Sequence, residues 1–538
     1  QLASFWQQEF GVRLTFRQLL DEHPSLQAVA DHIASMLASD SDGDRAQAAP
    51  DRSDALDGAG AALPPSGDGR AGESQADLSA ERRIPLTDGQ KEIWIASQAG
   101  VEASCAFNES DFFRIEGPLD ADLLASVIAQ VLDRHEALRM RFDADGEFAT
   151  IDHGARSEVQ RVDLSALEEK AREEALDALI AQAAGAPFDL EHGPTHRCWL
   201  VRLAPDVHAL VMFFHHLVFD GYSDGVIIRE VREAYNSIRK GGEIPRSRAV
   251  GYSEFIARKG ERRSQAERAM AHWCEVFAVP PAPLELPLDR PRTQSGVMRS
   301  FSADTVHQVL PAELMSTLQA VARARKCTLF HLLLAAFQCL LARLSGQGDI
   351  VIRIPAAGQA HLGIETVGFC VNALPVRGFA DEDKPFSAFL DETRMAVLGA
   401  MENQDVGIGE LTHQIRLPRS PDRLPLSDVF FNYSRYFAEA DFEGCKIVAH
   451  ENRRRWTFYD MFLHIEESGG QLIVDWDYST ALFDHETIER WLGHYIELLN
   501  GIARNIDDTI ADLPLMSAEE TAAIIAGWTG SQLAEGER

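Results

Sequence analysis

The sequence predicts a mixed α/β protein whose main body, residues 83–515, forms two lobes of similar size. Three observations support this fold class. Helical and strand-like segments alternate along the body. A similar arrangement of helices and a strand recurs in its second half. A stretch rich in charge and proline between Tyr252 and Pro287 separates the halves, and 538 residues are too many for one ordinary hydrophobic core.

The first half contains two predicted helices and a strand between them. "DADLLASVIAQVLDRHEAL" (120–138) has the apolar spacing of an amphipathic helix. The apolar run in "HALVMFFHHLV" (208–218) is short enough for a strand buried on both faces. "SDGVIIREVREAYNSI" (223–238) places its apolar residues on one side of a helix, for which Ser223 is the expected N-cap.

The second half repeats this kind of arrangement. "LMSTLQAVARARK" (314–326) and "LFHLLLAAFQCLLARLSG" (329–346) predict consecutive helices, and "DIVIRIPAA" (349–357) predicts a strand. No short-period repeat is visible, so a solenoid is not expected.

The segments before the body differ from it in composition. Residues 39–82 contain no aromatic and no β-branched apolar residue, which predicts a flexible linker. Residues 1–38 end in a helical pattern that follows Pro24 and Ser25. This piece is shorter than most domains that fold alone, so we interpret it as the C-terminal part of a domain.

Composition excludes several classes of function. The formal net charge of −32 argues against nucleic acid and anionic membranes as partners. The apolar runs are far too short to span a bilayer, and the first residues, "QLASFWQQEF", do not resemble a signal peptide. The seven cysteines are scattered without zinc spacing, so we expect reduced thiols, no metal site and a cytoplasmic location.

The stretch "FFHHLVFDGYSDG" (213–225) is the candidate functional site. His215 and His216 end the predicted strand, and Asp220 and Gly221 precede the next helix. Loops between rigid elements commonly carry functional side chains, although a single histidine near a core is more often structural. A shared metal ion is disfavoured, because adjacent histidines in a strand point to opposite faces. The stretch also contains "GYSDG" (221–225), which has the spacing of the GxSxG elbow of serine hydrolases, but we do not favour a hydrolase.

"HHLVFDG" (215–221) matches the HHxxxDG motif of the condensation domains of non-ribosomal peptide synthetases. Further segments resemble that family in the same order: "LTDGQKEIW" (86–94), "RHEALRMRF" (134–142), "YSEF" (252–255), "LPLDRPR" (286–292), "VGFCVNALPVR" (367–377), "PRSPDRLPLSDVFFNY" (418–433) and "WDYSTALFDHETIERW" (476–491). The resemblance covers roughly residues 83–515.

The ends of the chain also resemble parts of an assembly line. Residues 1–38 are similar to the C-terminal part of a carrier domain, and "TFRQLL" gives this part a polyketide-type character. Ser4 does not stand in the motif that carries the phosphopantetheine arm, so we expect the attachment serine outside this chain. Residues 516–538 are expected to form a linker toward an adenylation domain, because "PLMSAEETAAIIAGW" (514–528) resembles the start of one.

The resemblance implies a fold and an activity. Two lobes like chloramphenicol acetyltransferase, at 83–260 and 261–515, would form a V-shaped pseudo-dimer with a tunnel between them. An upstream carrier domain would present an acyl thioester, and a downstream carrier domain would present an amine. The product would be an amide, formed by an acyltransferase that holds no cofactor of its own, with carriers and a downstream adenylation domain as its partners.

The resemblance also assigns roles to residues in the motif. His216 would accept the proton of the attacking amine, and His215 would pack or orient the loop. Asp220 would be structural and would pair with an arginine, for which Arg353 is the candidate. Gly221 would permit the turn into the helix and let backbone approach the substrate, with its N–H near the oxyanion.

Two further residues are expected to support this site. Ser223 would cap the helix, and Asn372 would bridge elements near the contact of the lobes. Several positions depart from the family pattern: Gln359 follows "PAAG" where arginine is common, and Cys370, Ala373 and Asn403 replace the usual phenylalanine, threonine and histidine. None of these departures lies within HHxxxDG.

Other activities stay open at this point. An ester-forming or otherwise specialised condensation-like domain would share the motif, and an inactive domain could serve only to recruit partners. An epimerization domain is disfavoured, because no segment like "EGHGRE" occurs. A heterocyclization domain would carry DxxxxD in place of the histidine motif.

Overall fold

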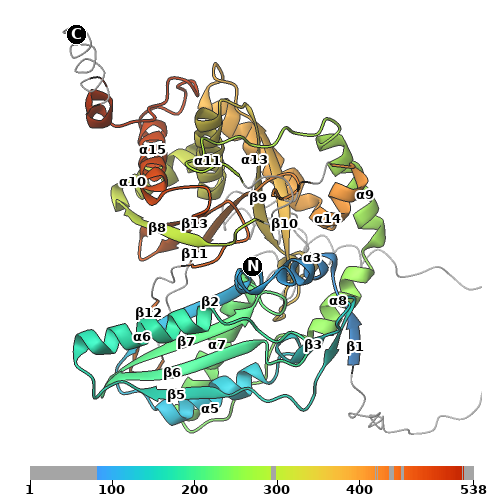
Figure 1. Ribbon diagram of the computed structural model, residues 1–538, viewed down its shortest axis with the longest axis vertical. Coiled ribbons are helices and arrows are strands. Elements are labelled where there is room, and N and C mark those ends of the chain that lie inside the picture. Colours follow the sequence, from blue (N-terminus) through green and yellow to red (C-terminus); the bar gives the residue numbers. More distant parts are fainter. Residues whose placement is uncertain are drawn as a thin grey trace, which may run out of the picture. The chain divides into compact units, whose positions relative to one another are not determined.

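The structure is a computed structural model that describes residues 82–292, 299–417, 420, 422–435, 442–449, 454–523 and 525. The chain divides into two compact units, Gln1–Arg82 and Arg83–Arg538. The predictions for residues 1–38 and for the linker up to residue 81 lie outside the described residues. The second unit contains the mixed α/β body (Figure 1).

The N-terminal lobe is built on a five-stranded sheet with the order β12-β2-β7-β6-β5. Its central strand is β7, which pairs antiparallel with β2 on one side and β6 on the other. The bounds of these strands are β2 Asn108–Glu116, β5 Val159–Asp163, β6 His196–Ala204, β7 Val207–His215 and β12 Lys446–Ala449. Figure 1 shows helices α5 (Ala121–Leu132), α6 (Glu169–Ala184) and α7 (Gly221–Arg239) packed around this sheet.

The predicted strand before the histidines is confirmed. Every residue of β7 from His208 to His215 is buried, because both faces of the sheet are covered. The helix that follows is also confirmed, with Val226, Ile227 and Tyr235 in the core of the lobe. The junction between them is therefore held by a strand and a helix that are both anchored in the core.

The C-terminal lobe has a six-stranded sheet with the order β10-β9-β11-β13-β14-β8. Strand β11 runs parallel to β9 and β13, and the other neighbours are antiparallel. The strands are β8 Ala303–Leu310, β9 Asp349–Ala357, β10 Val371–Phe379, β11 Val429–Arg435, β13 Met461–Ser468 and β14 Gln471–Ser479, and the packed helices are α10 Ala312–Ala324, α11 Leu329–Ser345, α13 Phe386–Glu402 and α15 His485–Arg504.

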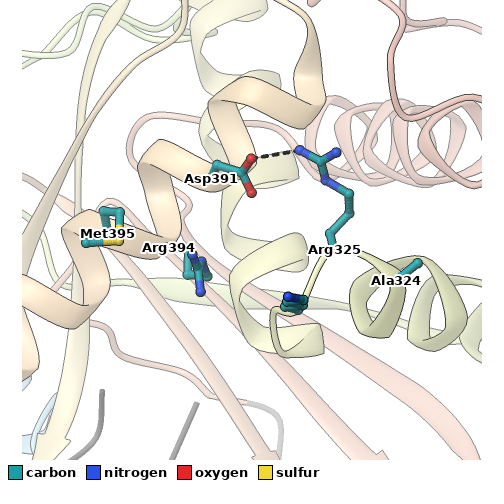
Figure 2. Close-up of a pocket in the computed structure, with 6 residues that line it drawn as sticks. Ala324, Arg325, Asp391, Arg394 and Met395 are labelled. Carbon is teal, nitrogen blue, oxygen red and sulfur yellow. Dashed lines mark hydrogen bonds and ion pairs between the residues drawn. The ribbon is translucent and has the colours of Figure 1, made fainter. Parts of the chain in front are cut away.

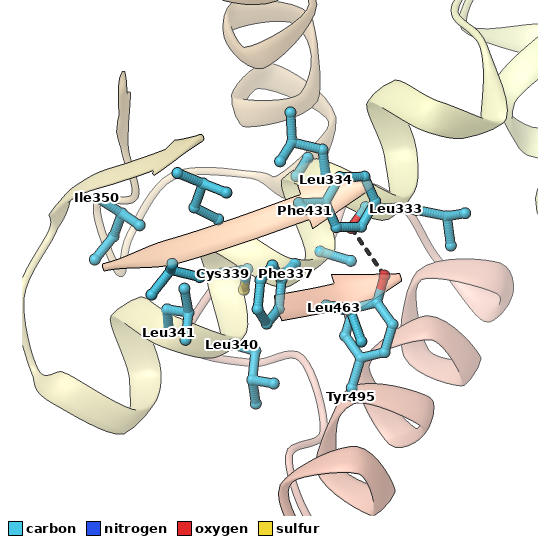
Figure 3. Close-up of a cluster of buried hydrophobic side chains, with 14 of the residues drawn as sticks. Leu333, Leu334, Phe337, Cys339, Leu340, Leu341, Ile350, Phe431, Leu463 and Tyr495 are labelled. Carbon is cyan, nitrogen blue, oxygen red and sulfur yellow. Dashed lines mark hydrogen bonds between the residues drawn. The ribbon is translucent and has the colours of Figure 1, made fainter. Parts of the chain in front are cut away.

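Helix α11 lies in the centre of the C-terminal core. All its residues from Leu332 to Leu341 are buried, so it is apolar on every side, as a fully enclosed helix requires. Phe337 packs edge-on against Trp476 and Tyr495, and the Tyr495 hydroxyl donates to the Leu333 carbonyl at 2.9 Å (Figure 3). The two helices and the strand predicted between 314 and 357 are confirmed in α10, α11 and β9.

The second half of the chain also contributes to the N-terminal lobe. Strand β12 pairs antiparallel with β2, with Ile447 opposite Ile115. Residues Phe369, Phe442 and Cys445 belong to the N-terminal hydrophobic core. A single boundary between 260 and 261 therefore does not separate the two cores, because the chain returns to the first sheet after residue 440.

The stretch predicted to separate the lobes is partly helical. It contains α8 (Tyr252–Gly260) and α9 (Arg263–Val276), in which Phe255, Ala269 and Trp273 are buried. Most of the charged residues that suggested a break are exposed, but Arg262, between the two helices, is 18% exposed and pairs with Asp405 at 2.6 Å. The predicted helix 120–138 ends earlier than expected, at Leu132, and is followed by a 3₁₀ turn at Ala137–Arg139.

Short elements complete the body. A three-stranded sheet, in the order β1-β4-β3, is formed by β1 Arg82–Pro85, β3 Met140–Phe142 and β4 Phe148–Ile151. Four short helices are α3 Asp88–Ser97, α4 Val101–Cys105, α12 Gly358–Leu362 and α14 Ile408–Gln414.

Two general features follow from the described residues. All seven cysteines are free thiols, as expected from their scattered positions. Within the described ranges no single helix has the length and apolarity needed to cross a membrane; α10 and α11 would pass only as a pair, and they are bent by 102°.

Candidate functional site

His216 lies immediately after β7, where the sheet ends. Its backbone N–H donates to the Phe107 carbonyl at 2.8 Å, which ties the loop to the start of β2. Its ring Nδ1 lies 2.8 Å from the Phe219 carbonyl, an acceptor, so Nδ1 carries the proton. The side chain is 23% exposed. The nitrogen left to act as a base is therefore Nε2.

His215 has a different environment from its neighbour. Its ring is completely buried between Phe107 and Phe188, with centroid distances of 6.2 Å and 6.1 Å. Burial, reinforced by the nearby His216, lowers its pKa to about 3. Nδ1 of His215 accepts the Leu217 N–H at 3.2 Å. His215 is thus a neutral residue that shapes the loop, which agrees with its expected role.

Asp220, and not Ser223, is the N-cap of α7. Asp220 has extended backbone angles, and its Oδ1 accepts the backbone N–H of Ser223 at 2.9 Å. Ser223 is the third residue of the helix, and its hydroxyl lies 2.8 Å from the same oxygen. The prediction for Ser223 was wrong because the helix begins two residues earlier, where the aspartate carboxylate can accept the N–H groups of the first turn.

Asp220 is held by a glutamine, and not by an arginine. Gln359 Nε2 donates to both carboxylate oxygens, at 3.2 Å to Oδ1 and 3.0 Å to Oδ2. The backbone N–H of Cys370 donates to Oδ2 at 2.9 Å. No lysine or arginine among the described residues forms an ion pair with Asp220. This buried carboxylate therefore depends on hydrogen bonds alone, from both halves of the chain.

The expected partnership of Asp220 with Arg353 is wrong. The Arg353 guanidinium donates instead to two backbone carbonyls, those of Ser427 at 2.9 Å and Pro425 at 2.5 Å. Arg353 is an interior residue of β9, whereas Gln359 lies in α12, just after that strand. In this segment it is Gln359, after the strand, that contacts the carboxylate, whereas Arg353 is directed at the chain before β11.

Gly221 does not need glycine's conformational freedom. It is the first residue of α7, and it is not among the glycines with positive φ. A Cβ built on Gly221 or on Gly225 would meet no atom within 4 Å. These two glycines share one face of the first helical turns. Gly221 therefore leaves open space beside the histidine loop, and the expectation that it permits a turn was wrong.

Residues 368–370 close the loop from the other side. The Ser223 hydroxyl accepts the Gly368 N–H at 3.0 Å, and the Tyr252 hydroxyl donates to the Phe369 carbonyl at 2.8 Å. Gly368 has φ +155, and a Cβ there would lie 2.2 Å from the Tyr252 ring, so only glycine fits. The Phe369 ring meets His216 edge-on, 5.0 Å between centroids. This segment therefore fixes one side of the His216 imidazole.

Asn372 bridges elements, as expected. Its side-chain amide donates to the carbonyls of Gln404 at 2.9 Å and Val406 at 2.7 Å. These bonds tie the start of β10 to the chain between α13 and α14. Asn372 is therefore a structural residue two positions beyond the Cys370 N–H that binds Asp220.

Three further residues of this site, in addition to Gln359, Tyr252 and residues 368–370, were not assigned to it from the sequence. Gln90, which forms a capping box with Thr87, donates to the Leu217 carbonyl at 2.8 Å inside the histidine loop. Gln90 lies in "LTDGQKEIW", a segment that resembles the family, and this resemblance could have identified it as a site residue. Glu109 lies 3.7 Å from His216 Nδ1, and Arg454 donates to Glu109 at 3.0 Å. No motif marked these two residues, because they come from distant strands and loops.

Two surface hollows lie on other elements. One, of about 410 Å³, is formed where α10 ends and α13 passes, and it contains an ion pair between Arg325 and Asp391 at 2.7 Å (Figure 2). The other, of about 510 Å³, is lined by Arg134, Arg139 and other residues beyond the end of α5. Neither contains a residue of the histidine loop.

In the part of the chain that the structure describes, no group of three or more histidine, cysteine or acidic residues could hold a metal ion.

Comparison with known proteins identifies relatives of this sequence. The model of the condensation-domain family matches residues 80–525. Tyrocidine synthase 3 of Brevibacillus parabrevis is 30% identical over 454 residues, which cover 83% of this chain and 7% of that protein. Surfactin synthase subunit 2 of Bacillus subtilis (strain 168) is 30% identical over 460 residues, 85% of this chain and 12% of that protein. The chain thus spans about a tenth of the length of these relatives.

Solved structures support the same fold. The first condensation domain of the calcium-dependent antibiotic synthetase, in complex with a substrate analogue, superposes with a TM-score of 0.70 at 20% identity, covering 81% of this chain and 99% of that one. The X-domain from teicoplanin biosynthesis gives a TM-score of 0.70 at 23% identity, covering 82% and 99%. At these identities the likeness shows the fold, which is the two-lobed fold expected from the sequence.

Proposed function

Because the chain belongs to the condensation-domain family of non-ribosomal peptide synthetases, we propose that it forms an amide bond between two carrier-bound substrates. An amine on a downstream carrier attacks an acyl thioester on an upstream carrier, and the upstream thiol leaves. One observation carries this proposal: His216 is a partly exposed imidazole whose Nδ1–H is fixed on the Phe219 carbonyl at 2.8 Å. Nε2 is therefore the nitrogen that accepts the amine's proton.

The reaction itself indicates how large each contribution is. An α-amino group has a pKa near 7.7–8.0, so about a tenth of it is neutral at pH 7, and prior deprotonation would gain only about tenfold. Holding both thioesters in line is worth roughly 7–11 kcal/mol. Proton transfer to His216 as the C–N bond forms contributes about 10²–10⁴-fold. Positioning is thus the main contribution, and the imidazole is the second.

The N-terminus of α7 supplies the complementary charge. The tetrahedral intermediate carries a negative oxygen, and the first N–H groups of a helix together with its dipole favour an anion there. Helix α7 begins at Gly221, whose face is open. We assign the Gly221 N–H as the donor to this oxygen. His215 and Asp220 shape the loop, and Ser223 and Asn372 brace it.

The context of the domain is part of this proposal. Residues 1–38 would be the end of a carrier domain, 39–82 a linker, and 516–538 a connection toward an adenylation domain. The polyketide-type character of "TFRQLL" favours an assembly line that also contains polyketide modules. The substrates would arrive on phosphopantetheine arms of neighbouring carriers.

Reconstitution with loaded carriers tests the activity. The purified chain is mixed with an acyl-loaded donor carrier and an aminoacyl-loaded acceptor carrier, and the acceptor is analysed by mass spectrometry. We expect an amide product, and a rate lower by about 10²-fold or more for His216→Ala. The variant must keep the thermal unfolding midpoint of the wild type. If folded His216→Ala forms as much product as the wild type, the role of His216 is contradicted. A second assay with an acceptor that carries a hydroxyl in place of the amine distinguishes ester formation from amide formation.

A further inference from the structure

The carboxylate of Glu109 lies within ion-pair distance of His216. Glu109 lies on β2 opposite Phe214 of β7, so the sheet register fixes its place beside the end of the histidine strand. Its Oε1 is 3.7 Å from His216 Nδ1, within ion-pair distance but longer than a hydrogen bond. The Nδ1–H is directed at the Phe219 carbonyl, so Glu109 acts on the ring through its charge.

Glu109 is in turn held by an arginine from the second half of the chain. Arg454 Nη2 donates to Glu109 Oε2 at 3.0 Å, and Arg454 Nε lies 3.2 Å from Asp477 Oδ2. The Thr305 hydroxyl donates to Asp477 at 2.7 Å. The guanidinium also lies 5.5 Å from the centroid of the Phe462 ring. A continuous series of charges thus runs from the imidazole to β14 of the C-terminal sheet.

This series keeps Glu109 ionised. Burial alone would raise the pKa of Glu109, but the charge of Arg454, the charge of His216 and the hydrogen bond from Arg454 together hold it below its usual value. The charge of Glu109 in turn raises the pKa of Arg454. The imidazole therefore has a permanent anion beside it, and behind that anion a permanent cation.

We propose that Glu109 is a positioning residue that stabilises His216 in its protonated form, and that Arg454 limits this effect. During the reaction a proton moves from the amine nitrogen to His216 Nε2 as the C–N bond forms. The ring becomes a cation at that moment, and an anion 3.7 Å from its other nitrogen lowers the energy of that state. Arg454 neutralises part of this anion and so limits how strongly Glu109 attracts a proton to the ring.

The other groups around the ring do not replace Glu109. On β7, His215 is neutral, since burial lowers its pKa to about 3. On β13, burial lowers the pKa of His464, which interacts with Glu109. From the loop before β10, the ring meets the edge of Phe369. Asp477 pairs with Arg454 at 3.2 Å and lies close enough to Glu109 for their charges to interact. Among the described residues that interact with His216, Glu109 is the anion nearest to it.

Two substitutions with opposite expected effects test this inference. The protonation of His216 is followed by NMR in protein with ¹³C-labelled histidine, and the signal lost in His216→Ala assigns the ring among the 18 histidines. In Glu109→Gln we expect the midpoint of this titration to move to lower pH. In Arg454→Met, which leaves Glu109 without its cation, we expect it to move to higher pH. Glu109→Asp, which keeps the charge, should lie between Glu109→Gln and the wild type.

Activity is measured on the same variants with loaded carriers. Glu109→Gln should reduce the rate of product formation by about 10- to 100-fold. The acid limb of its pH–rate profile should move in the same direction as the NMR midpoint. If both variants lose stability and neither midpoint moves, or if both midpoints move the same way, Glu109 is a structural clamp and the inference is wrong.

The inference rests on the proposed function, and the two can fail separately. The NMR titration reports the charge on the ring whether or not the chain makes an amide. Opposite shifts of the midpoint together with unchanged activity would retain the electrostatic role and reject His216 as the base.

Discussion

Each lobe contains a junction between a strand and a helix, and the two junctions have different roles at the site. In the N-terminal lobe, β7 leads through the histidine loop into α7, a helix of 19 residues capped by Asp220. In the C-terminal lobe, β9 leads directly into α12, a helix of five residues without a side-chain cap. The first junction presents His216, whereas the second presents Gln359, which binds Asp220. One junction carries the proposed base, and the other supports the loop that contains it.

This difference shows how the histidine loop is held by residues from both halves of the chain. Asp220 is buried, and the described residues that donate hydrogen bonds to its carboxylate are neutral: Ser223, Gln359 and the Cys370 backbone. Two of the three come from the C-terminal half. A neutral amide satisfies the carboxylate without adding a second buried charge, whose desolvation is costly. The position of His216 therefore depends on the contact between the halves.

The largest effect is expected from introducing a charge at Gln359, in the junction that supports Asp220. Gln359→Glu would place a second carboxylate against Asp220 and remove the amide donor. We expect the free energy of unfolding to fall by about 2–3 kcal/mol at pH 8 and the rate to fall by about 100-fold, since a small misplacement of the base is sufficient. Stability should partly recover as pH falls, because the introduced carboxyl group, once protonated, can again donate to Asp220.

A matched control for this change lies on α10. Gln319→Glu adds the same charge at a site where the Gln319 amide oxygen accepts from Arg323 at 3.4 Å. It should leave both stability and rate near those of the wild type. Denaturant unfolding and the carrier assay measure both variants, and equal behaviour of the two would contradict the bracing role of Gln359.

An intermediate effect is expected from filling the open space at the start of α7. In Gly221→Ala the added methyl group meets no protein atom within 4 Å, so stability should change by less than about 0.5 kcal/mol. The rate should nevertheless fall about tenfold, because the substrate needs this space. Gly493 on α15 has equally open surroundings. Gly493→Ala should stabilise the helix by about 0.5–1 kcal/mol and leave the rate unchanged.

Comparing these two variants shows whether the open space at Gly221 is used by the substrates, as we propose, or is occupied only by solvent, as at Gly493. Melting curves and the carrier assay are sufficient to compare them. An unchanged rate in Gly221→Ala would mean that the substrates do not use this face of α7.

The smallest effect concerns pH and a carboxyl pair near the first junction. Burial raises the pKa of Asp224 on α7 to about 6, and burial together with the charge of Asp224 raises the pKa of Asp111 on β2. A carboxyl whose folded pKa is raised binds more protons when folded, so its contribution to stability declines as pH rises from 3.8 to about 6. We therefore expect Asp224→Asn to gain melting temperature relative to the wild type across this window, by about 2–4 °C.

A second aspartate provides the reference for that measurement. Asp122 on α5 is 82% exposed and pairs with Arg161. Asp122→Asn removes the same charge at the surface, and its melting temperature should follow that of the wild type at every pH. If the Asp224→Asn curve is also parallel to the wild type, the pair does not hold a proton in the folded protein.

The sequence alone determined the helices and strands that depend on the pattern of apolar residues within a short segment. The apolar run before His215 specified a buried strand, and the apolar spacing after Ser223 specified a helix, because each pattern depends on neighbours within a few residues. The histidine motif was also readable, since its residues are contiguous. Helix boundaries were less secure: Ser223 was expected as the cap, although Asp220 has the better acceptor three residues earlier.

Only the tertiary structure decided which distant groups meet the motif. Gln359 binds Asp220 across 139 residues, and Arg454 binds Glu109 across 345. Strand β12 joins the first sheet from the far end of the chain. No periodicity encodes such contacts, because they arise from how two cores pack and where the chain crosses between them. The sequence therefore specified the imidazole that we propose as the base, and the fold specified the charges and hydrogen bonds that surround it.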